Sequence, residues 1–285
     1  MQEKKLKKIS EKRLLGMLEL HEMWLNNEKG GQRADLKGFD LRGYVFKTCN
    51  LSKVIFCGSD LSQARLEKTD LSHADFSSTK MKKVFLQKSL MESAILKNAD
   101  LSEARMSGVN LTFAILDLAN LKGVSLKEAN FDRANCVKTI LQDANLMKSY
   151  LSQVNLNGAN LRGVRLEDAS LENALLINAD LKFAHLENAW LRGANLEGAC
   201  LEKANLYQAN LYQANLKYAN LKEAYLGKAK LSWARLKMAN LTGANLLDAN
   251  IKFANFEGAN LKNVNFDSVK LDERTIKRAL LNRNE

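Results

Sequence analysis

The residues best suited to catalysis or metal binding are scattered through this sequence. His21 and Glu22 begin like the zinc-binding pattern HExxH, but position 25 is Leu, so the second histidine ligand is missing. The other two histidines, His73 and His185, are far apart along the chain. The four cysteines form no CxxC pair, and there is no glycine-rich phosphate loop and no nucleophile elbow. The sequence therefore predicts a protein that is not an enzyme and that holds no metal or cofactor.

Composition and charge narrow the class of protein further. The chain of 285 residues is 46% hydrophobic but contains no apolar run as long as a membrane span requires, so no such span is expected. Its N-terminus is basic and lacks an apolar signal core, which predicts a cytoplasmic protein and leaves secretion without a signal open. The net charge is +11, of which residues 1–33 carry +3 and residues 272–285 carry +1, leaving +7 for the middle. This modest excess favours acidic partners only weakly.

The secondary structure that positions the surface residues can be inferred from a sequence period of five. This period is visible in ANLYQANLYQANLKYANL at residues 204–221. From Leu36 to Leu271 every fifth residue, 48 in all, is apolar, and 37 of them are Leu. Ala usually stands two residues before each of these central positions. Helices repeat apolar residues at three and four and strands at two, so the sequence predicts a repeat architecture instead.

A period of five defines a solenoid with four sides. Two inward residues in every five need a short extended segment, and the remaining residues must turn the chain. Four such turns close a square, so residue n lies above residue n − 20 at a spacing of about 4.8 Å. The fold class expected is an all-β solenoid of about twelve coils, a parallel β-helix roughly 55 Å long with a packed core.

The repeat resembles a known family. The motif A[DN]LXX is similar to that of the pentapeptide repeat family, as in Ala34-Asp35-Leu36, Ala99-Asp100-Leu101 and Ala194-Asn195-Leu196. The resemblance covers about 240 of 285 residues and implies a right-handed quadrilateral β-helix. It implies no single function, because most members of the family have none assigned.

Both ends of the solenoid are expected to be capped by short helices. We divide the chain into an N-terminal capping helix (1–33), the β-helix (34–273) and a C-terminal helix or tail (274–285). Residues 4–28 predict an amphipathic helix that Gly30-Gly31 ends; its apolar stripe is Leu14, Leu18, His21 and Leu25, with Met17 and Trp24 alongside. The alternative interpretation is a helix that lies on a membrane surface. The five Glu among the eight basic residues of this region argue against it.

Details at each end extend this prediction. Phe39 and Tyr44 replace the usual small residue and are expected to contact the first helix near Leu18, Leu25 or Trp24. At the far end Asp272 is expected to cap a helix over Glu273–Leu281. That helix either covers the last coil or forms a homodimer, and both possibilities stay open.

Two outer surfaces are candidates for binding. A column of residues at intervals of 20 is mostly basic and could follow an acidic partner or a phosphate backbone. Its basic members, which we call the basic stripe, are Arg42, Lys82, Lys122, Arg162, Lys182, Lys222 and Lys262. No aromatic residue is expected to interleave with this stripe, so nucleic acid is disfavoured as a partner.

The second candidate surface is apolar. Large outward side chains gather in the regular half of the rod and are expected to form one contact patch for a protein partner or for self-association. Its members are Tyr212, Tyr218, Trp233, Met238 and Phe253. The alternative interpretation is that these are isolated aromatic side chains that shield the corners.

The leading functional hypothesis is a non-enzymatic interaction or scaffold protein that binds a protein partner through its outer faces. Some proteins of the resembled family mimic duplex DNA and bind gyrase or topoisomerase, but the +7 of the middle segment has the wrong sign for such mimicry. Two further hypotheses are a bacterial effector delivered into a host cell and a nucleic-acid binder that uses the basic stripe.

Overall fold

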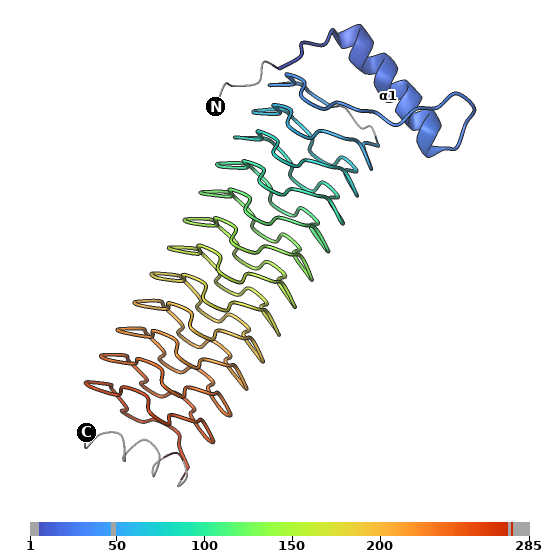
Figure 1. The fold of residues 1–285 in the computed structure, drawn as a ribbon. Coiled ribbons are helices and arrows are strands. Elements are labelled where there is room, and N and C mark those ends of the chain that lie inside the picture. Colours follow the sequence, from blue (N-terminus) through green and yellow to red (C-terminus); the bar gives the residue numbers. More distant parts are fainter. Residues whose placement is uncertain (1–5, 47–49, 273–274, 276–285) are drawn as a thin grey trace.

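The computed structural model describes residues 6–46, 50–272 and 275, and shows a long rod with one helix at its N-terminal end (Figure 1). Parallel β-bridges join residues 20 apart along the whole rod, from Asp35↔Ile55 to Asn250↔Lys270. Each bridge pairs single residues, so the described residues contain no strand of ordinary length. The expected parallel β-helix and its register are confirmed, whereas the number of coils and the direction of winding stay predictions.

The β-bridges form four columns, one on each side of the rod. We name the outer faces by the first residue of their columns: face A starts at Asp35, face B at Asp40, face C at Val45 and face D at Asn50. Each column continues at intervals of 20. Between two faces the chain turns through a corner of two residues, and each corner is named by the faces it joins, as in the D/A, A/B and B/C corners.

The centre of the rod is a continuous apolar core. The central residues of the repeat are buried from Leu36 to Leu261, including Leu96, Leu176 and Leu216, which are at most 1% exposed. The last two central residues differ, because Phe266 is only partly buried and Leu271 is 38% exposed. Phe266 still packs against the core, so the inward packing expected of the central residues reaches it, whereas Leu271 is not buried, because no described coil covers the last turn.

Backbone hydrogen bonds explain why Asn or Asp precedes so many central residues. In the repeat 60–64, the N–H groups of Leu61 and Gln63 donate to the next coil and that of Asp60 donates to the preceding coil. The N–H of Ala64 closes the corner on Leu61 O at 2.9 Å. Only the N–H of Ser62 lacks a backbone acceptor, and the Asp60 carboxylate accepts it at 2.9 Å. The short polar side chain thus completes the pairing of the backbone.

The second residue of nearly every corner has a left-handed backbone. Lys53, Gln63 and Lys68 have φ of 63°, 61° and 55°, and the same conformation recurs to Ser268 near the end of the rod. This conformation, with an i→i+3 hydrogen bond, is that of a type II turn, which prefers Gly or Asn. The fold imposes it on many other residue types, bulky ones included.

The helix α1 spans Glu11–Leu25 and lies across the first coils (Figure 1). Ser10 caps its N-terminus by accepting the N–H of Arg13, and its buried residues are Leu14 and His21. The expected stripe is therefore confirmed at these two positions, but the helix is shorter than the range 4–28. Within the described residues no helix is long and apolar enough to cross a membrane.

The segments before and after α1 are also held on the rod. Lys7 pairs with Phe39 as a β-bridge, and its ammonium lies 5.6 Å from the centre of the Phe39 ring. Tyr44 packs edge-on against Phe46, with 4.8 Å between ring centroids. Phe39 thus meets the segment before α1, and the expected contact of Phe39 and Tyr44 with α1 near Leu18, Leu25 or Trp24 stays a prediction. After α1, a Cβ at Gly31 would clash with the backbone of Trp24, so this close approach requires glycine.

At the C-terminal end, Asp272 accepts the N–H of Thr275 at 3.3 Å, as an N-cap residue does. The helix expected over Glu273–Leu281 falls mostly on residues 273–274 and 276–285, which lie outside the described residues. The choice between capping and dimerisation therefore stays a prediction.

Candidate binding surfaces

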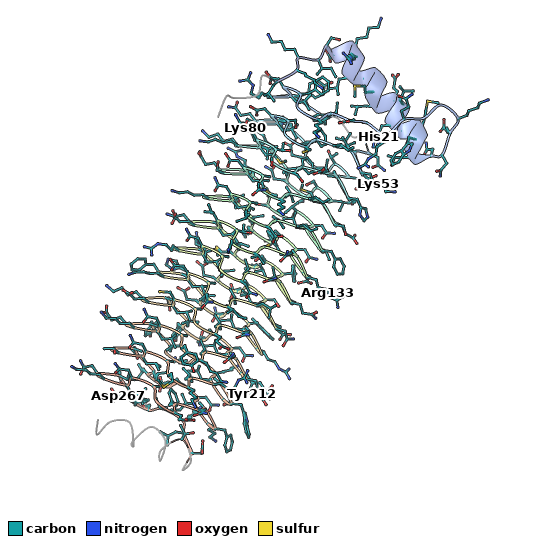
Figure 2. All side chains as sticks on the ribbon, viewed as in Figure 1. His21, Lys53, Lys80, Arg133, Tyr212 and Asp267 are labelled. Carbon is teal, nitrogen blue, oxygen red and sulfur yellow. The ribbon has the colours of Figure 1, made fainter. Side chains whose placement is uncertain are left out.

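His21, labelled beside α1 in Figure 2, is buried and has a structural partner on each ring nitrogen. Its Nε2 donates to the backbone oxygen of Ser52 at 3.0 Å, and its Nδ1 accepts the N–H of Ala34 at 3.2 Å. Burial lowers the pKa of His21, the hydrogen bond to Ser52 opposes this shift, and the Arg33 charge lowers it further. The neutral ring therefore serves as a connector between α1 and the rod.

The other candidates for chemistry lie far from His21. His73 and His185 are exposed, and His185 lies 3.7 Å from Glu187. Burial raises the pKa of the Cys136 thiol, so this cysteine stays protonated in the core. Across the described residues no three His, Cys, Asp or Glu side chains gather as metal ligands do.

The apolar patch occupies two successive corners of the rod. Trp233 and Phe253 stand on the D/A corner and stack with 4.6 Å between ring centroids. Tyr218 and Met238 stand on the A/B corner, and Met238 lies over Gly258. These four side chains are the exposed members of the patch, with 57% of Tyr218, 51% of Trp233, 52% of Met238 and 44% of Phe253 accessible.

Tyr212 is the first residue of a D/A corner, one coil before Trp233, and is less exposed than the other members of the predicted patch. It is half-buried, and the Arg192 guanidinium lies 5.6 Å from the centre of its ring. It lines a shallow depression with Arg192 and Lys230, beside the bridge column of face D. Figure 2 shows Tyr212 on the side of the rod near its C-terminal end. We therefore treat Tyr212 separately from the exposed corner residues.

The basic stripe runs along the B/C corner and is largely paired with carboxylates. Arg42 bonds to Asp40 at 2.7 Å, and Lys182 bonds to Glu202 at 2.9 Å. Among the described residues, further stripe pairs are Arg42–Asp60 (4.0 Å), Lys82–Glu103 (3.1 Å), Arg162–Asp180 (3.4 Å) and Lys222–Glu223 (3.6 Å). Such exposed pairs add little stability, but they reduce the positive field that a phosphate chain would meet.

An aromatic side chain lies among the cations of the basic stripe. Phe183 lies beside it, with the charges of Arg162 and Lys182 at 5.7 and 5.2 Å from its ring centre. The expectation that no aromatic side chain interleaves with the stripe is therefore wrong at this point. The cause is geometric, because Phe183 follows Lys182 on the same corner and reaches the residue one coil below.

Further aromatic groups lie outside both predicted surfaces. Trp190 on face D is 56% exposed, and Tyr207 stacks on Tyr225 with 5.6 Å between ring centroids. The column 190, 210, 230 and 250, taken at intervals of 20, is the sequence signal that places Trp190 near Lys230. Tyr207 and Tyr225 do not share a column. Tyr207 is the first residue of a corner, and such a residue lies next to the bridge residue of the following coil, which here is Tyr225. The ion pair Arg162–Asp180 has the same arrangement.

Comparison with known families identifies the repeat. The model of the pentapeptide repeat region matches residues 119–196. The model of pentapeptide repeats in eight copies matches six segments, of which the first four overlap: 32–67, 49–87, 86–123, 94–132, 189–227 and 229–267. A search of curated proteins gave no match.

Three solved structures are similar to this chain. HetL, a pentapeptide repeat protein involved in heterocyst differentiation regulation from the cyanobacterium Nostoc sp. strain PCC 7120, is 30% identical, with 92% of this chain and 94% of HetL covered and a TM-score of 0.35. QnrB1, a plasmid-mediated fluoroquinolone resistance protein, is 20% identical in one trypsin-treated variant form, with 72% and 93% covered and a TM-score of 0.42. A pentapeptide repeat protein from the Arabidopsis thaliana thylakoid lumen is 31% identical, with 40% and 73% covered and a TM-score of 0.27.

All three TM-scores are below 0.5, so the assignment rests on the family models, whose matched segments together span residues 32–267. The uninterrupted period of five and the bridges between successive coils agree with those matches. The chain belongs to the pentapeptide repeat family.

Proposed function

We propose that this protein is a rigid, non-enzymatic rod that binds a protein partner through the exposed corner residues Trp233, Phe253, Tyr218 and Met238. The observation that carries this proposal is the stacked pair Trp233–Phe253, which is exposed although both residues are large and apolar. A rigid scaffold loses little conformational entropy on binding, and Trp and Tyr frequently dominate interface energies.

The backbone at these corners strengthens the proposal. Tyr218, Trp233, Met238 and Phe253 are the second residues of their corners, with φ of 59°, 62°, 60° and 60°. Bulky residues are disfavoured there, and their exposure to water removes any gain from burial. Folding alone gives no reason for such side chains, and these four differ from Phe113 and Leu118, which share the conformation and the exposure, because Trp233 and Phe253 stack on one another.

The family comparison supports an interaction role and leaves the partner open. HetL is described as involved in heterocyst differentiation regulation, and that description names no partner. The relationship to QnrB1, at 20% identity, concerns the fold alone. We disfavour mimicry of DNA because the middle segment carries +7.

The experiment compares the double variant Trp233→Ser/Phe253→Ser with a matched control. Phe113→Ser/Leu118→Ser changes exposed apolar residues on the same two corners, nearer the N-terminal end. Each protein is used as bait in quantitative affinity purification from its native cells, and self-association is measured by sedimentation equilibrium. We expect a captured protein, or a dimer, to be lost only with the Trp233/Phe253 variant and to persist from about 0.1 to 0.5 M salt.

Three results would contradict the proposal. The first is that the Trp233/Phe253 variant captures partners and self-associates like the wild type. The second is that the control loses the same interaction, which would indicate general surface stickiness. The third is that Lys182→Glu/Lys222→Glu abolishes binding while Trp233→Ser/Phe253→Ser does not, which would move the site to the basic stripe.

A further inference from the structure

Two adjoining shallow depressions lie on face D near the C-terminal half of the rod. One, of ≈ 420 Å³, is lined by Arg192, Asn210, Tyr212, Lys230, Ser232 and Asn250. The other, of ≈ 330 Å³, is lined by Asn188, Trp190, Gln208, Asn210, Lys228 and Lys230. Because Asn210 and Lys230 line both, the depressions form one continuous surface, which we call the D surface.

The D surface is positively charged and has no carboxylate in its lining. Among the described residues, none of its three cations, Arg192, Lys228 and Lys230, lies within ion-pair distance of an acidic side chain, unlike most of the basic stripe. Arg192 instead rests on the Tyr212 ring, and the ammonium of Lys228 lies 5.6 Å from the centre of the Tyr207 ring. The hydrogen bond to the Tyr207 phenol raises the pKa of Lys228, so this group stays charged. Arg192 and Lys230 are thus available to an anionic ligand, and Lys228 keeps its charge although the phenol of Tyr207 and the more distant Asp248 carboxylate act on it.

An aromatic platform stands at the edge of these cations. Trp190 is 56% exposed and lies in the bridge column of face D, two coils from Lys230. Its neighbours in the column, Ser170 and Asn210, are smaller than the indole, more than half of which is exposed to solvent. Every nucleobase can stack on such a ring, whatever the sequence of the nucleic acid.

The amides of the D surface provide further donors. The Oδ1 atoms of Asn210 and Asn250 accept the corner N–H groups of Tyr212 and Lys252 at 3.2 and 3.3 Å. These oxygens are therefore engaged, and each amide presents its NH₂ group to a ligand. Amide donors suit phosphate oxygens and the carbonyl oxygens of bases.

We propose that the D surface binds single-stranded nucleic acid, with a base stacked on Trp190 and the phosphate backbone held by Arg192, Lys228 and Lys230. Paired bases in a duplex cannot reach a ring on a flat face, so an unpaired strand is required. A neutral sugar polymer would gain nothing from three cations. A sulfated polysaccharide would satisfy the cations but has no planar base for Trp190. This inference concerns a surface other than the corner residues proposed for protein binding and does not depend on that proposal.

The test measures binding of the full chain to a fluorescein-labelled oligothymidylate of about eight nucleotides by fluorescence anisotropy. Trp190→Ala should weaken binding about tenfold or more through the lost stacking, whereas Trp233→Ala, which removes the other highly exposed indole, should leave it unchanged. The wild type should show a slope of about −2 for log K against log salt, as expected for three phosphate contacts.

A charge-matched pair of variants separates a site from general attraction. Arg192→Gln/Lys230→Gln should weaken binding and reduce the magnitude of the salt slope to less than about 1. Lys182→Gln/Lys222→Gln removes the same charge from the basic stripe and should have little effect. Circular dichroism and the melting temperature, which should match the wild type because all these residues lie on the outer surface, check the fold of each variant.

Four results would overturn the proposal. These are no binding of the wild type at low salt, equal losses in the two charge-matched variants, equal losses in Trp190→Ala and Trp233→Ala, and tighter binding of duplex than of single-stranded DNA. Heparin competition and the Trp190→Ala variant together test base recognition. If heparin competes equally well with oligonucleotide on the wild type and on Trp190→Ala, and if Trp190→Ala binds the oligonucleotide as tightly as the wild type does, the surface binds polyanions without recognising bases.

Discussion

The imidazole of His21 accepts the backbone N–H of Ala34 at 3.2 Å while it donates to Ser52 at 3.0 Å. One ring therefore connects helix α1 to the start of the rod and to the next coil. Only the neutral ring can make both bonds, because a protonated Nδ1 has no lone pair for the Ala34 N–H. This connection makes the attachment of α1 sensitive to pH.

We expect the attachment of α1 to weaken as the pH falls below about 6.5. The folded pKa of His21 is lowered, mainly by burial, so the unfolded state binds more protons between the two pKa values. The stability that His21 contributes therefore rises with pH between the folded pKa and the ordinary pKa. This contribution is fully present above the ordinary pKa and is lost as the pH falls toward the folded pKa. Hydrogen exchange of the Ala34 amide, corrected for its intrinsic rate, should show the loss. In His21→Gln protection should be lower and should not change between pH 7 and 5; a wild type that shows no change over this range would contradict the prediction.

Burial should decide the cost of truncating a central leucine. Leu176 is fully buried in the middle of the rod, and Leu176→Ala should cost about 2–5 kcal/mol. Leu271 is 38% exposed at the end of the rod, so the same truncation there should cost less than about 1 kcal/mol. Urea unfolding monitored by circular dichroism compares the two, and equal costs would mean that the last turn is buried in solution.

The carboxylate of Asp75 should contribute through its acceptor oxygen and not through its charge. It accepts the N–H of Ser77 at 2.8 Å, the one N–H of the repeat without a backbone partner. Asp75→Ala should cost about 1 kcal/mol, whereas Asp75→Asn keeps an acceptor oxygen and should cost little. Thermal unfolding of both variants at two salt concentrations distinguishes the acceptor role from a charge effect. An equal loss of stability in Asp75→Asn and Asp75→Ala would assign the effect to charge.

Glycine should stabilise one position of a corner and destabilise its neighbour. Lys138 has φ of 55°, so Lys138→Gly removes the cost of a left-handed backbone and should raise stability by up to about 1 kcal/mol. Val137, the first residue of the same corner, has no positive φ, so Val137→Gly should lower stability by about 0.5–1 kcal/mol. Melting temperatures that move in the same direction for both variants would contradict this account of the corner.

The sequence alone determined the repeat and most of the core. An apolar residue at every fifth position from Leu36 predicted which side chains are buried, because only one geometry places two residues in five inward without interruption. The same period predicted which residues stack at intervals of 20, and the bridges follow that register. Local rules also predicted Leu14 and His21 as the buried stripe of α1.

The tertiary structure decided how the surface residues combine. Carboxylates beside the B/C corner neutralise most of the basic stripe, and Tyr212 lines a depression with Arg192 and Lys230. Neighbours on successive coils are not always 20 residues apart, because their separation depends on the direction in which a corner side chain points. A column taken at intervals of 20 therefore finds only some of these neighbours. The exposure of Leu271 has a related cause, because a period in sequence does not show where the last covering coil ends.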